Sequence, residues 1–259
     1  MVDLHAHILP GLDDGAVDMD EAISMCRIAA SDGISTIVAT PHTGNGVYTN
    51  GRDRILDGVA TLNAGLREED IHVEILPGAD VYVNRDMAGM IAAGNAMTVN
   101  DGGRYMMIEL PWQMIPAGFE DWIFDLELKG IVPIITHPER NLAVAENMRE
   151  LHKWVKLGAL VQITAMSITG QFGSMVRESA RRMLKDNLVH VISTDAHSPS
   201  QRPPVLSRAR DAAARLIGGT QAATLVDTNP RMIIEGKSVD ALTPLSGKTP
   251  GLIHRLFQR

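Results

Sequence analysis

Four side chains of types that bind metal ions lie close together near the start of the chain. Residues 3–15 read DLHAHILPGLDDG, so His5, His7, Asp13 and Asp14 fall within ten residues. Packing alone does not call for such a group, because histidine and aspartate are seldom buried without partners. In His-x-His at the end of an extended strand, alternate side chains point the same way. His5 and His7 can therefore hold one ion.

The elements that would position these residues follow a regular pattern. Short β-branched runs alternate with amphipathic segments, which is typical of βα units around a parallel sheet. We expect seven strands, at 2–4, 36–39, 73–76, 105–108, 132–135, 160–163 and 189–192. We expect a first helix that begins at a capping box, with Asp18 as cap and Glu21 three positions on. Further helices are expected at 52–67, 119–129, 145–156, 174–185 and 205–217.

No linker or change of composition divides the chain. We therefore expect a single domain over residues 1–259, with a less regular tail from about residue 237 that ends in His254, Arg255 and Arg259.

Candidate metal ligands follow or close six of the expected strands. In a parallel barrel all strand carboxyl ends open on one rim, where active sites are built. The sequence therefore predicts a cluster on that rim, made of His5, His7, Asp14, His42, Asp80, Glu109, His137, Asp195 and His197. For any one of them the alternative is a hydrogen-bonded loop residue or a helix cap, but that alternative would have to hold at six strand ends independently. His72, His152, His190 and His254 lie elsewhere, and we assign them to surface or packing roles.

Imidazole and carboxylate ligands together suit Zn, Mn or Fe. Some nine ligands would crowd a single ion, so two or three ions are expected, and multinuclear sites belong chiefly to phosphoester and related hydrolases. Arg140 in THPER and Arg202 in SQRPP lie in loops on the same rim and are candidates for a phosphate clamp. A solvated surface arginine is the alternative at each position. Asp13 is interpreted as a turn residue.

Composition excludes several other classes. The net charge of -7 argues against a sequence-independent grip on nucleic acid. There is no secretory signal and no apolar run near 20 residues, so a membrane-embedded protein is not expected. The single cysteine, Cys26, lies in a helical pattern and fits a core position in a cytoplasmic protein. No CX5R loop surrounds it, which excludes cysteine-based phosphatase chemistry.

The motifs HAH, PH, THPER and STDAH, in this order after successive strands, resemble the PHP (polymerase and histidinol phosphatase) superfamily. The longer context, DLHAHILPGLDDG, THPERN and DAHS followed by QRPP, is similar to its CpsB/CapC branch of bacterial manganese-dependent protein-tyrosine phosphatases. The resemblance covers roughly residues 1–235. It implies a distorted (β/α)7 TIM-like barrel, which agrees with the seven expected strands, and a centre of two to three divalent metals, Mn²⁺ by preference, with Fe or Zn as alternatives.

The resemblance also implies a division of the ligands. One ion would take His5, His7, Asp80 and Asp195; a second would share Asp80 and add Glu109 and His137; a third would take Asp14, His42 and His197. The family usually has Glu where this chain has Asp80, so the bridge is one methylene shorter. The implied activity is hydrolysis of phosphotyrosine by metal-generated hydroxide, with Arg140 and Arg202 binding phosphate.

Two alternatives remain open. The first is a PHP phosphatase acting on histidinol phosphate or another small phosphomonoester, which the loops at 43–52, 84–104 and 111–118 would decide. In the last of these, LPWQMIPAGF, the aromatic residues either wall the site or simply pack. The second is a metal-stabilised regulatory module without catalysis. The resemblance implies a role in capsule and exopolysaccharide biosynthesis, opposite a tyrosine autokinase of polysaccharide export. The sequence leaves open whether the chain forms a homo-oligomer.

Overall fold

The strands form a parallel barrel. In the computed structural model, which describes residues 1–239 and 243–245, the strands are assigned to two sheets. The first has the order β1-β2-β4, with β1 Val2–Ala6, β2 Thr36–Ala39 and β4 Glu74–Pro77. The second runs β3-β5-β6-β7-β8-β9, with bounds His42–Thr43, Asp80–Tyr82, Tyr105–Glu109, Val132–Thr136, Leu160–Thr164 and Val191–Ser193.

Nine strand elements make seven strand positions because two strands are interrupted. β2 breaks before β3 at Pro41, which has no N–H for the ladder. β4 breaks before β5 at Gly78, where an added Cβ would lie 2.7 Å from the side chain of Val38. Pairing resumes with His42 opposite Asp80. Two candidate ligands that were expected in loops therefore lie on short strands in register with each other.

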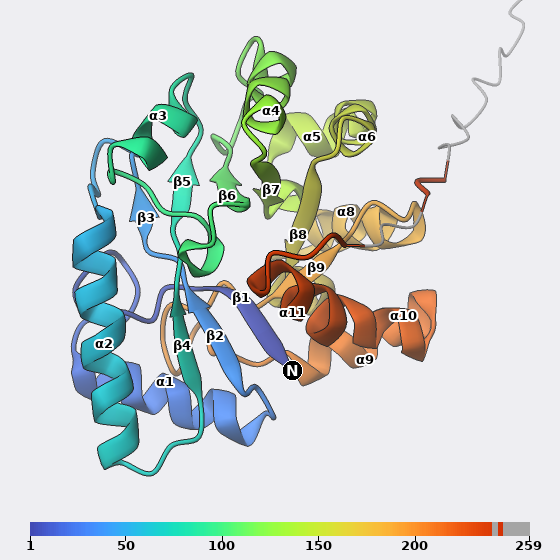
Figure 1. Cartoon of the computed structure of the whole chain (residues 1–259). Coiled ribbons are helices and arrows are strands. Elements are labelled where there is room, and N and C mark those ends of the chain that lie inside the picture. The colour runs from blue at the N-terminus through green and yellow to red at the C-terminus, as the bar shows by residue number, and fades with distance from the viewer. Residues whose placement is uncertain (240–242, 246–259) are drawn as a thin grey trace, which may run out of the picture.

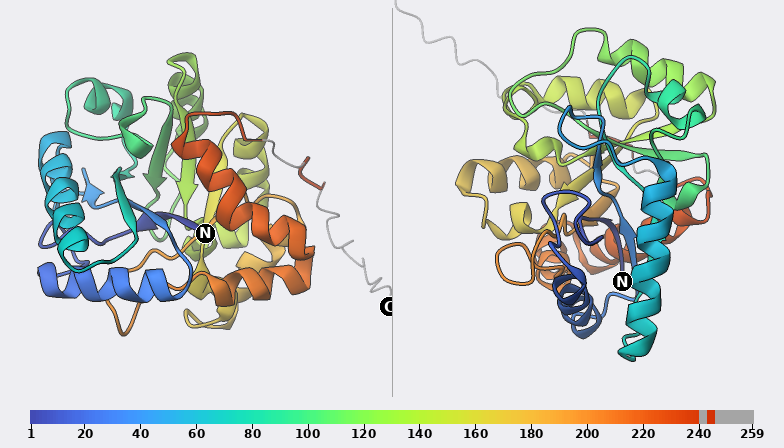
Figure 2. Two further views of the ribbon diagram at one scale, coloured as in Figure 1. Left: turned by 60° about the horizontal axis from the view of Figure 1, so that its bottom comes forward. Right: turned by 90° about the vertical axis from the view of Figure 1, so that its left-hand side faces the viewer.

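Main-chain bonds close the barrel between β9 and β1. The N–H of Asp195 donates to the carbonyl of His5 at 2.8 Å, and the N–H of His7 donates to the carbonyl of Ala196 at 2.8 Å. The segment after β9 thus runs beside the end of β1. The predicted barrel of seven strands is confirmed, and Figure 2 shows the helices arranged around it.

The helices cover the outside of the barrel (Figure 1). The longer ones are α1 Met19–Ser31, α2 Arg52–Glu68, α4 Phe119–Leu128, α6 Met148–Lys156, α8 Ser174–Lys185 and α9 Ser207–Ile217. The shorter ones are α3 Met87–Ala92, α5 Leu142–Glu146, α7 Ala165–Thr169, α10 Gly219–Ala223 and α11 Asn229–Ile234.

The core has two parts, as the alternation along β6 illustrates. Met106 and Ile108 belong to the larger cluster between strands and helices, whereas Tyr105 and Met107 belong to a smaller cluster with residues of the other strands and Ile233 of α11. Successive strand side chains point to opposite faces, so the smaller cluster fills the barrel interior. The carboxyl ends of the strands above it are left to polar residues.

Side-chain caps begin two of the described α-helices, α1 and α5. Asp18 caps α1 as predicted, accepting a hydrogen bond from the N–H of Glu21 at 2.9 Å. The helix expected at 145–156 is instead two helices, α5 and α6, because Asn147 adopts a non-helical backbone between them.

None of the helices in the described part of the chain is long and apolar enough to cross a membrane. The basic residues predicted to end the tail lie outside the described residues.

Candidate metal centre

The nine predicted ligands converge on one rim of the barrel. They come from β1, β3, β5 and β6 and from the segments that follow β1, β7 and β9, and most adjoin a cavity of about 320 Å³. Three overlapping groups offer ligand atoms that all lie within 4.8 Å of one another: His5, His7 and Asp80; His42, Asp80 and Glu109; and His7, Asp14, His42 and His197. Segments far apart in the chain therefore supply one continuous site.

Asp80 lies at the centre of the site. Its Oδ2 atom is 3.6 Å from Nε2 of His5, 3.7 Å from Nδ1 of His42 and 3.8 Å from Nε2 of His137. The other oxygen accepts a hydrogen bond from the hydroxyl of Thr136 at 3.0 Å. One carboxylate oxygen thus faces three imidazoles, and this fully buried side chain is shared by two of the three groups.

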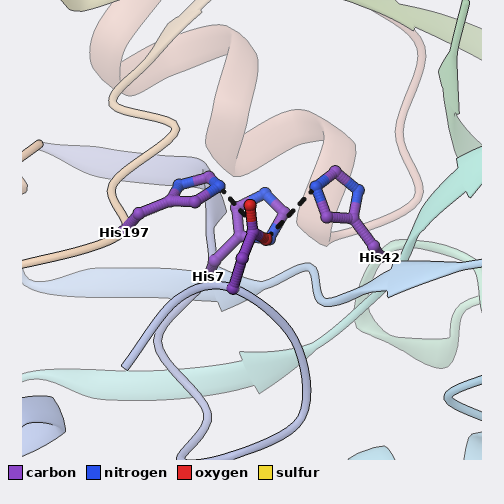
Figure 3. A group of neighbouring side chains, drawn as sticks. His7, His42 and His197 are labelled. Carbon is purple, nitrogen blue, oxygen red and sulfur yellow. Dashed lines mark ion pairs between the residues drawn. The ribbon is translucent and has the colours of Figure 1, made fainter. Parts of the chain in front are cut away.

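The group around Asp14 lies nearer to solvent. Figure 3 shows the rings of His7, His42 and His197 turned toward one another. Oδ1 of Asp14 lies 3.6 Å from Nε2 of both His42 and His197, and the Asp14 side chain is 53% exposed. This part of the site can exchange ligands with solvent more readily than the buried part around Asp80.

Asp195 connects the ligand groups to the two predicted arginines. Its Oδ1 atom lies 3.5 Å from Nε2 of His5 and 3.4 Å from Nε2 of His7. Its Oδ2 atom accepts hydrogen bonds from the guanidinium groups of both Arg140 and Arg202. Burial alone would raise the pKa of Asp195, but the histidines and arginines around it hold that pKa well below its usual range. Asp195 is therefore an ionised ligand-type group.

His7 has a dedicated partner in Asp13. Nδ1 of His7 lies 2.6 Å from Oδ2 of Asp13, which also accepts from the N–H of His42 at 2.9 Å. Burial opposes protonation of His7, but the ion pair with Asp13 outweighs it and raises the pKa of His7 to about 10. A metal ion bound at Nε2 of His7 would displace the proton from that nitrogen. The other oxygen of Asp13 accepts from the N–H of Gly15 at 3.0 Å. Interpreting Asp13 as a turn residue only was incomplete, because it also orients His7.

The remaining buried histidines are held neutral. Burial lowers the pKa of His5 to about 4 and that of His137 to about 3, with Arg140 adding to the effect at His137. The pKa of His197 is lowered to about 2, first by burial and then by the charge of His7. Neutral imidazole is the form that binds metals. Nδ1 of His5 lies 3.0 Å from Oε1 of Gln162, which leaves Nε2 facing the site.

Two of the predicted ligands have strained backbones. His137 has a φ of 35° and Asp195 a φ of 52°, both in the left-handed region that side chains other than glycine rarely adopt. Such conformations cost about 1–3 kcal/mol and persist where the surrounding structure fixes them. At these strand ends the strain aims both side chains into the site.

The site fits divalent metal ions by its chemistry. Within the described residues, Oδ2 of Asp80 and Nδ1 of His42 are buried and have no hydrogen-bond partner. An unsatisfied buried polar atom costs about 1–3 kcal/mol, and metal coordination removes that cost. Donor atoms bound to one ion at about 2.1 Å must lie roughly 3–4 Å apart. The separations between His5, His7 and Asp80 fall in or near that range.

An aromatic wall adjoins the ligand groups. Tyr48, Tyr82 and Trp112 line the cavity. Trp112 is 54% exposed. Its ring stacks on that of His137 with 6.1 Å between the ring centroids, and the guanidinium carbon of Arg140 lies 4.5 Å from the Trp112 ring centroid. Of the alternatives for the loop at 111–118, Trp112 thus walls the site, whereas Phe119 just beyond is buried and packs edge-on against Trp154.

Sequence reasoning missed several supporting residues. Phe172, whose ring lies 4.9 Å from the guanidinium of Arg140 and 5.8 Å from that of Arg202, gives no local signal of this role. Tyr48 and Tyr82 are isolated aromatic residues in the sequence. The position of Asp13 six residues after His7 was the one available hint, since metal-binding histidines commonly donate their second N–H to a carboxylate.

Comparison with known proteins places this site in a family. The chain matches the family described as capsular polysaccharide synthesis, CpsB/CapC, over residues 1–235. It is 40% identical to the tyrosine-protein phosphatase YwqE of Bacillus subtilis over 202 residues, which are 78% of this chain and 79% of that protein. It is 28% identical to the tyrosine-protein phosphatase CpsB of Streptococcus pneumoniae over 239 residues, 90% of this chain and 98% of that one.

Solved structures agree with the fold. One solved structure superposes on this chain with a TM-score of 0.92 at 34% identity. It comes from a description of YwqE of Bacillus subtilis and CpsB of Streptococcus pneumoniae as unique metal-dependent tyrosine phosphatases. It covers 96% of this chain and 100% of its own. A dihydropyrimidinase from Brevibacillus agri superposes with a TM-score of 0.58 at 11% identity, covering 94% of this chain and 73% of its own. That second likeness concerns the fold alone.

Proposed function

This chain belongs to the CpsB/CapC family of capsular polysaccharide synthesis, and from that premise and the chemistry of its site we infer that it is a metal-dependent tyrosine phosphatase. The observation that carries the inference is the set of three overlapping ligand groups beside a cavity with two arginines and an aromatic wall. A single ion would not need so many donors.

We propose that two to three divalent ions occupy these groups. His5, His7, Asp80 and Asp195 would hold the buried ion. Asp80, Glu109 and His137 would hold the second, and Asp14, His42 and His197 the third. The geometry supports one refinement, since His7 and His42 each adjoin two groups and can contribute to either. Mn²⁺ is the proposed native metal, with Fe or Zn as alternatives that the same donors accept.

When bound, such ions supply a nucleophile from water at neutral pH and neutralise phosphate charge. This chain's own residues position the substrate. Arg140 and Arg202 share Asp195 as their anchor, and guanidinium groups can bind phosphate oxygens in bidentate fashion. Asp195 therefore keeps both arginines beside the place where phosphate must bind. The low pKa values of His5, His137 and His197 keep their lone pairs available at neutral pH.

The proposed substrate is a phosphotyrosine side chain of a protein. Trp112 presents an exposed ring beside Arg140, and Tyr48 and Tyr82 line the same cavity. These rings suit a phenyl group whose phosphate points at the arginines. A tyrosine autokinase of polysaccharide export is the proposed partner, in a reducing cytoplasm that the single buried Cys26 suits.

The test is turnover by the metal-loaded protein. We expect hydrolysis of a phosphotyrosine peptide, loss of activity on chelation, and recovery with Mn²⁺. Elemental analysis should find two to three equivalents of transition metal. The His5→Ala and Asp195→Ala double variant should be inactive, and full activity in that variant would refute the assigned centre.

The same assay separates the alternatives. Faster turnover of histidinol phosphate than of the phosphotyrosine peptide would favour a phosphatase of small phosphomonoesters. Metal binding without turnover of any phosphomonoester would favour a regulatory module. The aromatic wall favours a substrate with a ring over a simple alkyl phosphate, and the apolar phenyl ring of phosphotyrosine over the smaller, more polar imidazole of histidinol phosphate.

A further inference from the structure

A second cavity lies outside the metal centre and is lined by residues of α7, α8 and α9. Figure 1 shows α8 and α9 across the barrel from α2. There α7, α8 and α9 pack against one another. The cavity measures about 620 Å³ and shares no lining residue with the one at the ligand groups. Its walls carry four arginines, Arg177, Arg181, Arg208 and Arg215, together with the acid Asp211 and smaller residues of α7 and α9.

The spacing of the arginines places them in pairs on one face of each helix. Arg177 and Arg181 are four residues apart on α8, and Arg208 and Arg215 are seven apart on α9. Residues at these intervals lie on the same side of a helix. Two helices therefore turn two guanidinium groups each toward one hollow.

These charges are not compensated within the described part of the chain. None of the four guanidinium groups there has a carboxylate oxygen within 4.0 Å, whereas the neighbouring Arg182 and Arg210 pair with Asp186 and Asp211. Asp211, the acid in the cavity wall, is engaged by Arg210 at 2.9 Å. Nε of Arg181 is buried and lacks a hydrogen-bond partner among the described residues.

Arg181 is half-buried and the other three arginines are exposed, so the cluster costs a little stability, which a bound anion would recover. Like charges four residues apart on a helix repel, and a buried donor without a partner adds a further cost. The concentration of positive charge stands out in a chain whose net charge is -7. The hollow also falls within the roughly 300–1,000 Å³ usual for small-molecule sites.

We propose that this cavity is a second ligand site, which binds a small anion carrying two or more phosphate groups. Guanidinium groups match phosphate oxygens in bidentate geometry and stay charged at any physiological pH. Four of them around one hollow suit a compact polyanion such as pyrophosphate or a nucleoside diphosphate. Ile168, Ala212 and Leu216 give the apolar surface that the non-phosphate part of such a molecule would contact.

Isothermal titration of the metal-loaded full chain with pyrophosphate and with ADP tests the proposal. Excess Mg²⁺ keeps these probes from removing the resident metal. Two variants are compared with the wild type: the double variant Arg181→Gln with Arg208→Gln, and the control Arg67→Gln. Arg67 is an exposed arginine near the end of α2, on the far side of the barrel.

We expect the wild type and the control to show one more binding site than the double variant, or an affinity roughly tenfold higher or more, since each charged hydrogen bond lost is worth about a factor of ten. Equal affinity for both probes would assign recognition to the phosphate groups. Tighter binding of ADP would assign it to a nucleotide. Unchanged turnover of p-nitrophenyl phosphate in the double variant confirms that it is folded.

Identical titrations for the wild type and the double variant would overturn the proposal. So would an equal loss in Arg67→Gln, which would indicate a general effect of charge. Binding of a glutamate-rich peptide at this cavity without binding of either phosphate probe would overturn it in favour of a protein-docking surface. Should the double variant fail to fold, Arg208→Gln alone, at an exposed position, gives the same comparison.

Discussion

Nδ1 of His7 lies 2.6 Å from Oδ2 of Asp13, and this contact fixes which nitrogen of His7 faces the ligand groups. With Nδ1 engaged by the carboxylate, Nε2 points at Nε2 of His5 at 3.1 Å and at Asp195. The arrangement is that of a carboxylate that orients a metal-binding histidine and raises its basicity. Asp13 is thus a positioning residue of the proposed centre.

Replacing Asp13 by asparagine should weaken the metal centre without unfolding the protein. Loss of such an orienting carboxylate costs about 10- to 100-fold in metal affinity or activity. We expect the Mn²⁺ concentration for half-maximal phosphatase activity to rise by that factor in Asp13→Asn. The exposed Asp20→Asn on α1 is the matched control and should leave the titration unchanged. An unaltered Mn²⁺ titration in Asp13→Asn would contradict the orienting role.

Asp80→Asn should reduce the number of bound metal ions. Oδ2 of Asp80 faces three histidines, and Asp80 belongs to two ligand groups. A neutral amide at this position should therefore weaken metal binding by both groups. Elemental analysis after dialysis should find about one equivalent fewer than in the wild type. Asp57→Asn, on the exposed face of α2, serves as control. A full complement of metal in Asp80→Asn would show that Asp80 does not bridge.

Arg202→Gln should lower kcat/KM for phosphotyrosine while keeping the metal. A charged donor aimed at a reacting phosphate is worth about 100-fold in rate. Glutamine has neither the positive charge nor the planar set of N–H donors of the guanidinium group. Asp195 keeps Arg140 as a partner in this variant, so the ligand groups should persist. Measured metal content separates this outcome from loss of the centre. Arg149→Gln, an exposed position on α6, should behave as the wild type.

Trp112→Ala should affect aromatic substrates selectively. If the ring packs against the phenyl group, KM for a phosphotyrosine peptide should rise about fivefold to tenfold, in line with an aromatic contact of roughly 1 kcal/mol. KM for an alkyl phosphate should stay constant. Phe124 on α4 is 55% exposed, close to the 54% of Trp112, and lies outside the cavity lining. Phe124→Ala is therefore the control, and equal changes for both substrates in Trp112→Ala would rule out a packing role.

His190 gives the protein a dependence of stability on pH that is separate from the metal site. Burial lowers the pKa of His190 to about 4, and its Nδ1 accepts from the N–H of Val161 at 3.0 Å. The folded state thus binds its proton less readily than the unfolded chain, whose value is 6.5. The contribution of neutral His190 to the free energy of unfolding is complete above pH 6.5. It is lost as the pH falls from 6.5 toward 4, by up to about 3 kcal/mol.

His190→Asn keeps an acceptor for Val161 and removes this titration. Thermal unfolding across pH 4.5–7.5 should therefore show a smaller acid-side loss in the variant than in the wild type. Parallel pH profiles for the two proteins would mean that His190 is protonated equally in both states.

Much of the fold was predictable because the signals are local. The strand at 36–39 and the helix at 174–185 have the bounds that period and propensity predicted. The interruption of β2 and β4 was not predicted, since it depends on how closely Gly78 approaches Val38 across the sheet. The division at Asn147 was also missed. Asn147 is a single residue inside an otherwise helical pattern, so no local signal in the sequence marks the break.

The sequence by itself determined which kinds of atoms the rim would offer, because ligand-type residues at the ends of parallel strands must meet on one side of a barrel. Only the tertiary structure decided how those atoms are shared. His5 and Asp195 are 190 residues apart and become neighbours through the main-chain bond that closes the barrel. His42 meets Asp80 through the register of two interrupted strands. Pairings of this kind are fixed by long-range hydrogen bonds and packing, which leave no periodic trace in the chain.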